Sequence, residues 1–539
     1  MKKIIYSLAV LLLCGSCSDF LDTIPKDALS PATTWQTESD AEKFLTGCYR
    51  DWLWGEEFFF LDCASDIGFN FHEEGSGYQP TGNGSLTAGA TVNFYNFTRI
   101  RKVLTFLDNI DRIPFANEAK QKDMIAQAKI IRAYDYFKMN FWYGGVPIIA
   151  LFAGGDEAKV SRKTEAEVKQ YVYDEIDAAL LDINATPAAR GQVAKGAALA
   201  LKMRSALYWG DYQRSLDAAN AIKALGQYEL DADFSNVFTL AGRDSKEIIL
   251  AVQHEKNLSD EWIVTVPNNG DGGWSSLVPT QNLIDLYEMS SGLTKEETGS
   301  GYDATHPFKG RDPRMAMTVL YPGQDWASSY NGVLNTLETL LPDGNKNPNH
   351  PSSAANSSKT GLTWAKYVTP IEQYEDDLYS TSTCYIVFRY AEVLLTKAEA
   401  ENELTGPSTA VYDALDEVRT RAGMPPVDKT KYATKEALRE LIRRERSVEL
   451  AGEGHRRADI VRWKDSSGKM VAETVLNKPL TRITGTINYS EPDPELRAVV
   501  GTETEQIEPR KFVVANRYLP FRQGDLDKNP QLEQNDGYK

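Results

Sequence analysis

Apolar residues recur three or four positions apart over much of the first half of the chain, which is the spacing of an amphipathic helix. The segments with this pattern are 41–52, 93–112, 126–137, 168–180 and 197–219. The polar run 37–40 and the pair Thr164 and Glu167 can cap two of the expected helices. The run 144–147 (GGVP) must end another, because glycine and proline interrupt helices.

One helical pair follows a known repeat pattern. Small residues and Leu201 precede a short turn at Gly210-Asp211-Tyr212, and alanines continue on the next helix. This order is typical of tetratricopeptide hairpins, in which alanines let antiparallel helices approach closely. We therefore expect a mainly α fold, with a helical scaffold of tetratricopeptide-like hairpins.

The middle of the chain has a different character. Residues 247–252 (EIILAV) predict a buried strand or a short apolar segment, and residues 72–89 are a polar insertion rich in Gly and Ser. Residues 268–359 are dominated by Gly, Asn, Ser, Thr, Pro and Trp and predict loops. A loop region of that length in a compact chain is usually functional. Helical periodicity returns within residues 384–464, so helices from both ends of the chain would hold the loop region between them, and the tail after Arg517 predicts loop.

The N-terminus has the features of a bacterial lipoprotein signal. Lys2 and Lys3 precede an apolar run, 4–13, that is too short to span a bilayer, and Gly15-Ser16 stands directly before Cys17 as in a lipobox. We expect cleavage there, with Cys17 as the diacylated first residue of a protein anchored outside the cytoplasm. The expected parts are a signal peptide at 1–16 and a lipid-anchored tether at 17–36. Residues 37–232 would form an N-terminal helical part that contains a binding-loop insertion, and residues 233–539 a C-terminal part.

Charge and cysteine content narrow the function classes. The formal net charge of -17 opposes binding to a polyanion, so no nucleic-acid partner is expected. Once the signal is removed, Cys48, Cys63 and Cys384 remain as thiols and allow at most one disulfide. We expect three buried cysteines.

The densest group of charges is the segment 443–464, RRERSVELAGEGHRRADIVRWK, whose composition resembles an active site. Its acidic residues alternate with arginines, and Gly452 and Gly454 end a helix that Thr434 can begin. Interleaved charges can pair across adjacent helices, because arginine meets a carboxylate through two hydrogen bonds. We therefore expect structural ion pairs here rather than catalysis.

Patterns for catalysis or metal binding are incomplete. His254-Glu255 begins like a zinc-peptidase helix, but Leu258 stands where the second histidine is needed. Residues 343–347 begin like a calcium loop, yet Pro348 replaces its turn glycine, which leaves open a structural calcium site of other geometry. No cofactor is expected. Carboxylate pairs suited to a glycosidase occur by chance among 76 acidic residues.

Six motifs follow one another along the chain. They are Cys17-Ser18-Asp19-Phe20-Leu21-Asp22; Arg132-Ala133 with Tyr143-Gly144-Gly145-Val146-Pro147; Arg311-Asp312-Pro313-Arg314; Arg389-Tyr390-Ala391-Glu392-Val393-Leu394-Leu395; the segment 443–463; and Asn529-Pro530-Gln531-Leu532 with Gln534-Asn535-Asp536-Gly537-Tyr538. In this order they resemble the SusD/RagB family of Bacteroidetes outer-membrane lipoproteins, over nearly the whole chain. The resemblance implies an α-helical scaffold, a loop-rich face that binds glycan, exposure at the cell surface, and a SusC-like TonB-dependent transporter as partner.

Aromatic rings on polar loops are the candidate glycan contacts, because the C–H faces of sugars lie flat on rings while polar groups bind the hydroxyls. The candidates are Trp274, Trp326, Tyr330 and Tyr78. A ring that only pins its own loop to the body fits each position as well as a ligand contact does. Phe58 to Phe60 adjoin a helix end and are expected in the core.

The expected function is capture of an oligo- or polysaccharide and its delivery to the transporter, without catalysis. Capture of peptide, or contact with the transporter alone, would use exposed rings in the same way. A glycoside hydrolase is the less favoured alternative, and it predicts new reducing ends on incubation with polysaccharide.

Overall fold

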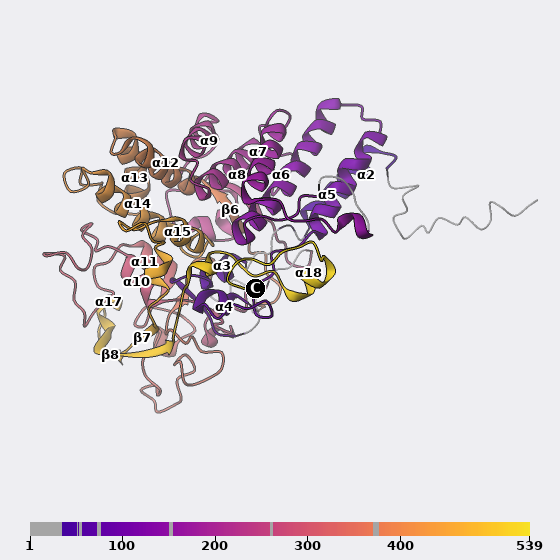
Figure 1. Ribbon diagram of the computed structural model, residues 1–539. Helices are drawn as coiled ribbons and strands as arrows, with labels where there is room; N and C mark the ends of the chain where they lie inside the picture. Colours follow the sequence, from indigo (N-terminus) through magenta and orange to yellow (C-terminus); the bar gives the residue numbers. More distant parts are fainter. Residues whose placement is uncertain are drawn as a thin grey trace, which may run out of the picture.

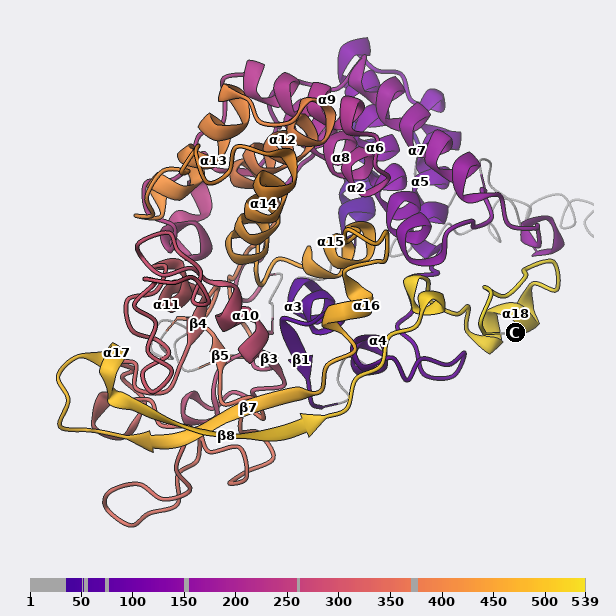
Figure 2. The same ribbon diagram turned by 60° about the vertical axis from the view of Figure 1, so that its left-hand side comes forward.

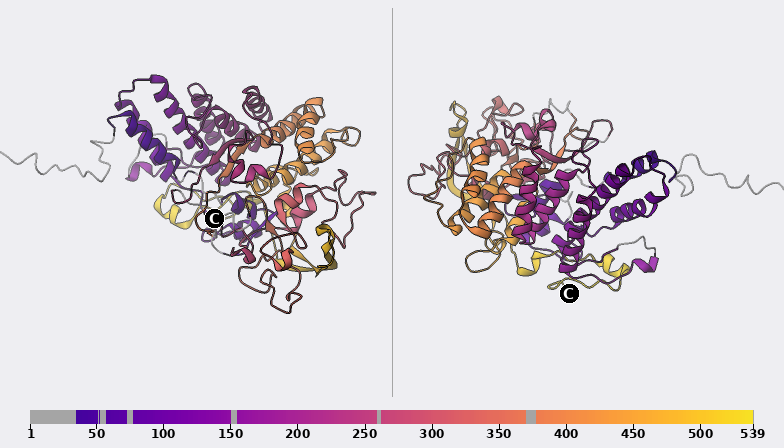
Figure 3. Two further views of the ribbon diagram at one scale, coloured as in Figure 1. Left: turned by 180° about the vertical axis from the view of Figure 1, so that it is seen from behind. Right: turned by 90° about the horizontal axis from the view of Figure 1, so that it is seen from above.

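The computed structural model describes residues 35–50, 52, 57–72, 77–149, 155–258, 262–369 and 377–538. Helices from both ends of the chain form one curved row, and the loop region lies beneath it (Figure 1). Seen from above, the row continues from the N-terminal helices to those that follow residue 390 (Figure 3). The expected mainly α architecture, with helices on both sides of a loop region in sequence, is confirmed.

The N-terminal half of the row consists of α2 (Glu38–Tyr49), α5 (Thr98–Asn109), α6 (Glu118–Tyr143), α7 (Glu165–Leu180), α8 (Lys195–Tyr208) and α9 (Tyr212–Ala224). Consecutive helices pack on one another, α6 on α7 and α8 on α9. Thr37 and Thr164 form the expected capping boxes at the starts of α2 and α7. Gly144 takes φ +71° directly after α6, a conformation that favours glycine, so α6 ends where the sequence predicts.

The second half of the row consists of α12 (Tyr390–Thr405), α13 (Thr409–Arg421), α14 (Lys435–Glu449) and α15 (Arg456–Arg462). Helix α12 packs on α9 as well as on α13 and α14, and so joins the two ends of the chain. Ala197, Ala198 and Ala200 of α8 are buried, as the close approach of helices in a hairpin requires.

The strands of the described ranges form four two-stranded antiparallel sheets. These pair β1 (Gly68–Asn70) with β3 (Leu277–Pro279), β2 (Ile248–Val252) with β6 (Tyr385–Arg389), β4 (Val319–Leu320) with β5 (Thr363–Trp364), and β7 (Leu480–Ile487) with β8 (Ala498–Glu508). Of the two possibilities for residues 247–252, the structure shows the strand, because residues 248–252 form β2. The β7–β8 ribbon is absent from the sequence-based expectations and runs across the lower part of the molecule in Figure 2, with further loops below it.

Residues 268–359 are mainly loops, as predicted, with the short helices α10 (Gln281–Leu286) and α11 (Arg314–Thr318). The other short helices are α3 (Glu57–Cys63), α4 (Tyr78–Asn83), α16 (Ala472–Val475), α17 (Pro494–Arg497) and α18 (Gln523–Lys528). Helix α18 lies in the tail after Arg517, for which the sequence predicts only loop.

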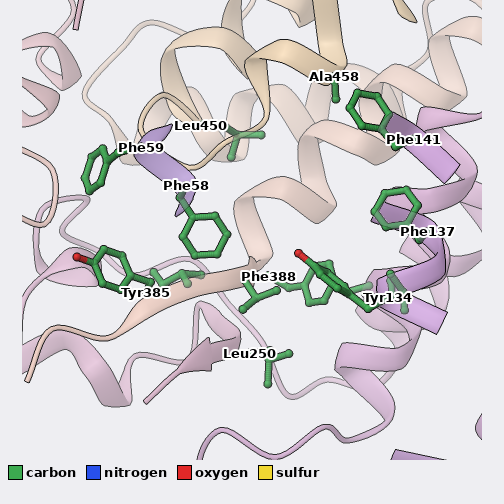
Figure 4. Close-up of a cluster of buried hydrophobic side chains, with 14 of the residues drawn as sticks. Phe58, Phe59, Tyr134, Phe137, Phe141, Leu250, Tyr385, Phe388, Leu450 and Ala458 are labelled. Carbon is green, nitrogen blue, oxygen red and sulfur yellow. The ribbon is translucent and has the colours of Figure 1, made fainter. Parts of the chain in front are cut away.

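A central hydrophobic core lies where α3 and α6 meet β6 (Figure 4). Phe58 and Phe59 of α3 approach Tyr385 of β6, and Tyr134 and Phe137 of α6 belong to the same buried group. Phe60 has no exposed surface, so the expected core position of residues 58–60 is confirmed. This core joins the N-terminal helices to the C-terminal half of the chain.

Cys48 and Cys63 are buried and Cys384 is half-buried, and all three are free thiols. The expected signal peptide, Cys17 and the tether up to residue 34 lie outside the described residues. The described chain begins at Trp35, whose ring packs on Phe44 with 4.7 Å between centroids. Within the described ranges, no helix is both long and apolar enough to cross a membrane.

Candidate ligand-binding site

Trp274 lies at the end of a tightly built loop, residues 267–275. Gly272 takes φ +80°, and a Cβ on Gly273 would lie 2.2 Å from the carbonyl oxygen of Pro267, so neither position suits another residue. Ser275 takes φ +45°, which is uncommon for a residue with a Cβ. Such conformations persist only where surrounding contacts impose them, and they concentrate at functional sites.

Three aromatic rings meet above this loop. The Trp274 ring contacts the Tyr379 ring at 6.1 Å between centroids, and Tyr379 contacts Trp262 at 5.4 Å, both edge to face. The Ile263 N–H donates to the carbonyl oxygen of Leu378 at 2.9 Å, which holds the two outer segments side by side. We name Trp262, Trp274 and Tyr379 the aromatic cluster.

The aromatic cluster faces solvent. Trp262 is 53% exposed and Tyr379 46% exposed, while Trp274 is half-buried and packs partly on the core. Exposed rings of this size that lie together mark a binding surface more often than isolated exposed residues do. The cluster therefore offers adjoining apolar faces to a ligand.

Trp326 joins the same loop from another side. Its indole Nε1 donates a hydrogen bond to Asp271 Oδ2 at 2.7 Å, and Asp271 stands three positions before Trp274. The structure thus brings together the two predicted tryptophans. Tyr330 is half-buried on the turn that follows Trp326, and its ring packs edge to face on Tyr489 at 5.7 Å.

Tyr78 lies in the core, apart from the aromatic cluster, so the structure gives no support to the prediction that its ring contacts a ligand. Gly77 takes φ +97° and starts α4, which carries Tyr78 inward until only 4% of it is exposed. The Tyr78 ring packs on Phe60 at 5.0 Å and on Phe94 at 6.1 Å between centroids. A ring enclosed in this way has no face to offer a sugar.

Sequence reasoning missed Trp262 and Tyr379. Both stand beside acidic and polar residues without helical periodicity, within Ser259-Asp260-Glu261-Trp262 and Asp376-Asp377-Leu378-Tyr379. Trp326 stands in the same kind of surroundings, in Gln324-Asp325-Trp326-Ala327-Ser328, so the sequence carries a signal for these two rings as well.

The segment 443–464 is a buried ion-pair network, as predicted. Glu445, Glu449 and Glu453 are spaced four apart from α14 into the following turn, and each is buried. Arg314 pairs with Glu445 and Glu449, and Arg389 pairs with Glu449 and Glu453. Ion pairs to further groups extend the network to Glu247, Glu288, Asp312, Lys366, Arg419, Arg421 and Arg444.

The electrostatics of this network favour structure over acid–base chemistry. Burial opposes ionisation of Glu445, but the charges of Arg314 and Arg419 outweigh it and hold the pKa of the carboxyl below its ordinary value. Burial, together with nearby arginines, lowers the pKa of His455 well below its usual range, and its Nδ1 lies 3.1 Å from the Tyr208 hydroxyl. The Glu445 carboxylate therefore stays charged and the His455 imidazole stays neutral near pH 7.

Metal binding gains no support from the described residues. They contain no group of three or more His, Cys, Asp or Glu side chains placed to hold an ion. In the calcium-like segment, Asn347 Nδ2 donates to the carbonyl oxygens of Asn335 and Glu338, and Asn345 Nδ2 donates to Asp343. The side-chain nitrogens of Asn345 and Asn347 thus make the contacts within this segment, and an amide nitrogen cannot bind a cation.

A cleft of about 780 Å³ lies apart from the aromatic cluster, between α5, the segment around Ile149 and α18. Tyr95 and Phe97 line it together with Asp525 and Asn529. None of the four rings predicted from sequence borders it.

Comparisons with known proteins agree on one family. A family model described as the SusD family matches residues 246–538, and one described as starch-binding and associating with the outer membrane matches residues 19–207. The SusD-like protein P25 of Formosa agariphila is 25% identical over 503 residues, which cover 86% of this chain and 90% of that protein.

Solved structures give the same result. A SusD-like carbohydrate-binding protein from Bacteroides fragilis superposes with a TM-score of 0.79 at 27% identity, over 93% of this chain and 100% of that chain. A protein described as a laminarin-binding SusD-like protein superposes with a TM-score of 0.69 at 21% identity, over 94% of this chain and 100% of that chain. The second likeness concerns the fold alone.

Proposed function

Because this chain belongs to the SusD family, we propose that it captures a glycan at the cell surface and binds it on the aromatic cluster of Trp262, Trp274 and Tyr379. Proteins of this family bind glycans and are not catalytic, in agreement with the expectation of a binding protein rather than an enzyme. The single observation that carries the proposed site is the meeting of three half-buried or exposed rings, Trp262 and Trp274 from the segment between β2 and β3 and Tyr379 from the segment before β6.

The chemistry of the cluster suits sugar. The rings cover apolar C–H faces of a pyranose, while hydroxyls at its edge remain free for polar loop groups or water. Leaving large rings in water is otherwise unfavourable, at roughly 25 cal/mol for each Å² of apolar surface. A bound glycan would remove part of that surface from water.

We expect alanine at Trp262, Trp274 or Tyr379 to weaken glycan binding by about 1–3 kcal/mol, as for other stacked rings. Residues 18–539 would be run in affinity gels containing starch, laminarin or mannan, and the polysaccharide that retards the protein would be titrated by calorimetry. Leu181→Ala removes an 83% exposed apolar side chain beside α7 and should leave affinity unchanged.

Three outcomes would redirect the assignment. Wild-type affinity in all three folded ring variants would place the site elsewhere, with the cleft beside Tyr95 as the next candidate. Binding of peptides by a protein that no polysaccharide retards would favour peptide capture instead. Reducing ends that appear on incubation would indicate hydrolysis.

The proposal has two further parts. The protein delivers the glycan to a SusC-like TonB-dependent transporter, and a lipid on Cys17 anchors it to the membrane. The lipobox sequence supports the anchor, and the match to a family model described as associating with the outer membrane supports the location. In cells fed with radiolabelled palmitate, the wild-type protein should carry label and Cys17→Ser should not. Equal labelling of both proteins would contradict the anchor at Cys17.

A further inference from the structure

Asp271 connects the two loops that carry Trp274 and Trp326. Its side chain is buried, with 5% of the residue exposed, and Oδ2 accepts hydrogen bonds from Trp326 Nε1 and from Asn268 Nδ2, both at 2.7 Å. Hydrogen bonds to a charged acceptor are stronger than neutral ones, particularly where water is excluded. One carboxylate oxygen therefore fixes an indole from one loop and an amide from the other.

The loop between Asp271 and Trp274 has little freedom to absorb a movement. The Asp271 N–H donates to Asn268 Oδ1 at 3.1 Å, and the Gly273 N–H donates to the Asn268 carbonyl oxygen at 3.0 Å. The Trp274 N–H donates to the Val264 carbonyl oxygen at 2.7 Å. The backbone N–H groups from Asp271 to Trp274 all donate hydrogen bonds, that of Gly272 to the Asn269 carbonyl oxygen. A shift of Asp271 should therefore move Trp274.

The Trp326 side of the connection is anchored as well. The Trp326 N–H donates to the Gly332 carbonyl oxygen at 2.8 Å and closes a turn. Asp325, directly before it, pairs with Arg497 of α17 at 2.6 Å. Trp326 is thus attached to the body independently of Asp271, and can act as a fixed point for the Trp274 loop.

We propose that Asp271 is a positioning residue, which sets Trp274 relative to Trp326 and thereby sets the affinity of the aromatic cluster for glycan. Asp271 is buried, and it acts through Trp326 and Trp274 without touching the sugar. This inference rests on the proposed function, but the coupling of the two rings can be measured without any glycan.

The coupling is tested by ¹⁹F NMR on the chain from residue 18 labelled with 5-fluorotryptophan, with signals assigned by Trp→Phe variants. Asp271→Ala should shift the signals of both Trp326 and Trp274 and leave that of the buried Trp364 in place. Asp271→Asn should restore both signals towards wild type, since its amide oxygen can accept the same two N–H groups. Trp326→Phe keeps a ring, removes the indole donor and should also shift Trp274.

Affinity is measured in parallel with starch and laminarin. Asp271→Ala should lower the affinity for whichever polysaccharide binds wild type about tenfold, the scale of one lost hydrogen bond, and Asp271→Asn, which keeps an oxygen acceptor, should recover most of the loss. Asp465→Ala is the matched control, because Asp465 also accepts loop N–H groups, from Ser467 and Lys469, on an exposed turn after α15. It should change neither affinity nor the ¹⁹F signals.

A purely local role for Asp271 would lower the melting temperature of Asp271→Ala yet leave the Trp274 signal and the affinity of the folded protein unchanged, and that result would overturn the proposal. If Asp271→Ala does not fold, Trp326→Phe decides, and an unmoved Trp274 signal there overturns the coupling. Absence of binding by wild type to any polysaccharide would count against the proposed function instead, while the ¹⁹F shifts would still report on the coupling.

Discussion

At the scale of single residues, Gly273 is the position where the smallest substitution should disturb the site most. A Cβ on Gly273 would lie 2.2 Å from the Pro267 carbonyl oxygen, whereas one on Gly272 would meet nothing within 4 Å. Alanine at Gly272 faces only the cost of its positive φ, about 1–2 kcal/mol of stability. We expect Gly273→Ala to weaken glycan binding about tenfold or more, equivalent to about 1.4 kcal/mol, and Gly272→Ala to change affinity little.

Titration of both variants with the bound polysaccharide, beside their melting temperatures, separates the two effects. A Gly273→Ala protein with wild-type affinity would mean that the loop can relax without moving Trp274. An equal loss of glycan affinity in both variants would point to backbone strain as its cause, rather than to the contact with Pro267.

Local sequence could not separate Trp274 from Tyr78, because both follow glycines in polar surroundings. The difference comes from partners far along the chain. Tyr78 packs on Phe60 and Phe94 inside the core, whereas Trp274 meets Tyr379 at the surface. Composition identifies a ring on a loop, but only the tertiary partners decide which way that ring points.

At the scale of elements, α14 offers a test of the ion-pair network. Glu445 is buried and pairs with Arg314 and Arg419, so Glu445→Ala leaves two buried guanidinium groups short of a partner. Removal of one member of a buried pair costs about 3–5 kcal/mol. Glu440 on the same helix is 66% exposed at its side chain and pairs with Arg443, and its loss should cost at most about 1 kcal/mol.

Thermal unfolding of the two alanine variants, followed by a glycan titration of each, checks this prediction. Glu445→Ala should melt well below Glu440→Ala and wild type, while the fraction that remains folded binds glycan with wild-type affinity. A stable Glu445→Ala protein that has lost affinity would return the segment 443–464 to the candidates for the binding site.

The elements that sequence predicted well are those fixed by local contacts. Thr37 and Thr164 cap their helices through side chains three residues away, and Gly144 ends α6 through its own backbone. The β7–β8 ribbon was missed because its strands depend on pairing with each other, Leu480 with Glu508 at one end, and are polar along much of β8. The charges of 443–464 indicated pairing, but their partners at Arg314 and Arg389 could not be found from spacing.

At the scale of the whole molecule, paired carboxylates set the stability in acid. Burial opposes ionisation of Glu399, but Arg462 and Arg446 outweigh it and hold its pKa at about 2, below the ordinary 4.5. A lowered pKa contributes stability above pH 4.5, and this contribution is lost as the pH falls through about 2. Glu399→Gln should therefore be less stable than wild type at pH 6, and its melting temperature should fall less between pH 4.5 and pH 2.

The contribution of Asp62 to stability changes with pH in the opposite direction, because it decreases as the pH rises. Burial raises its pKa to about 7 from an ordinary 3.8, although the N–H groups of Gly454, Gly452 and Arg456 partly offset the effect. A raised pKa contributes stability fully below pH 3.8, and that contribution is lost as the pH rises through 7. The Asp62 contribution therefore falls steadily between pH 3.8 and pH 7, while that of Glu399 is already complete above about pH 4.5. In melting curves taken at intervals from pH 2 to pH 9, the melting temperature of Asp62→Asn should decline less than that of wild type between pH 4.5 and pH 7. An equal decline of both proteins over this interval would show that Asp62 is already ionised throughout it.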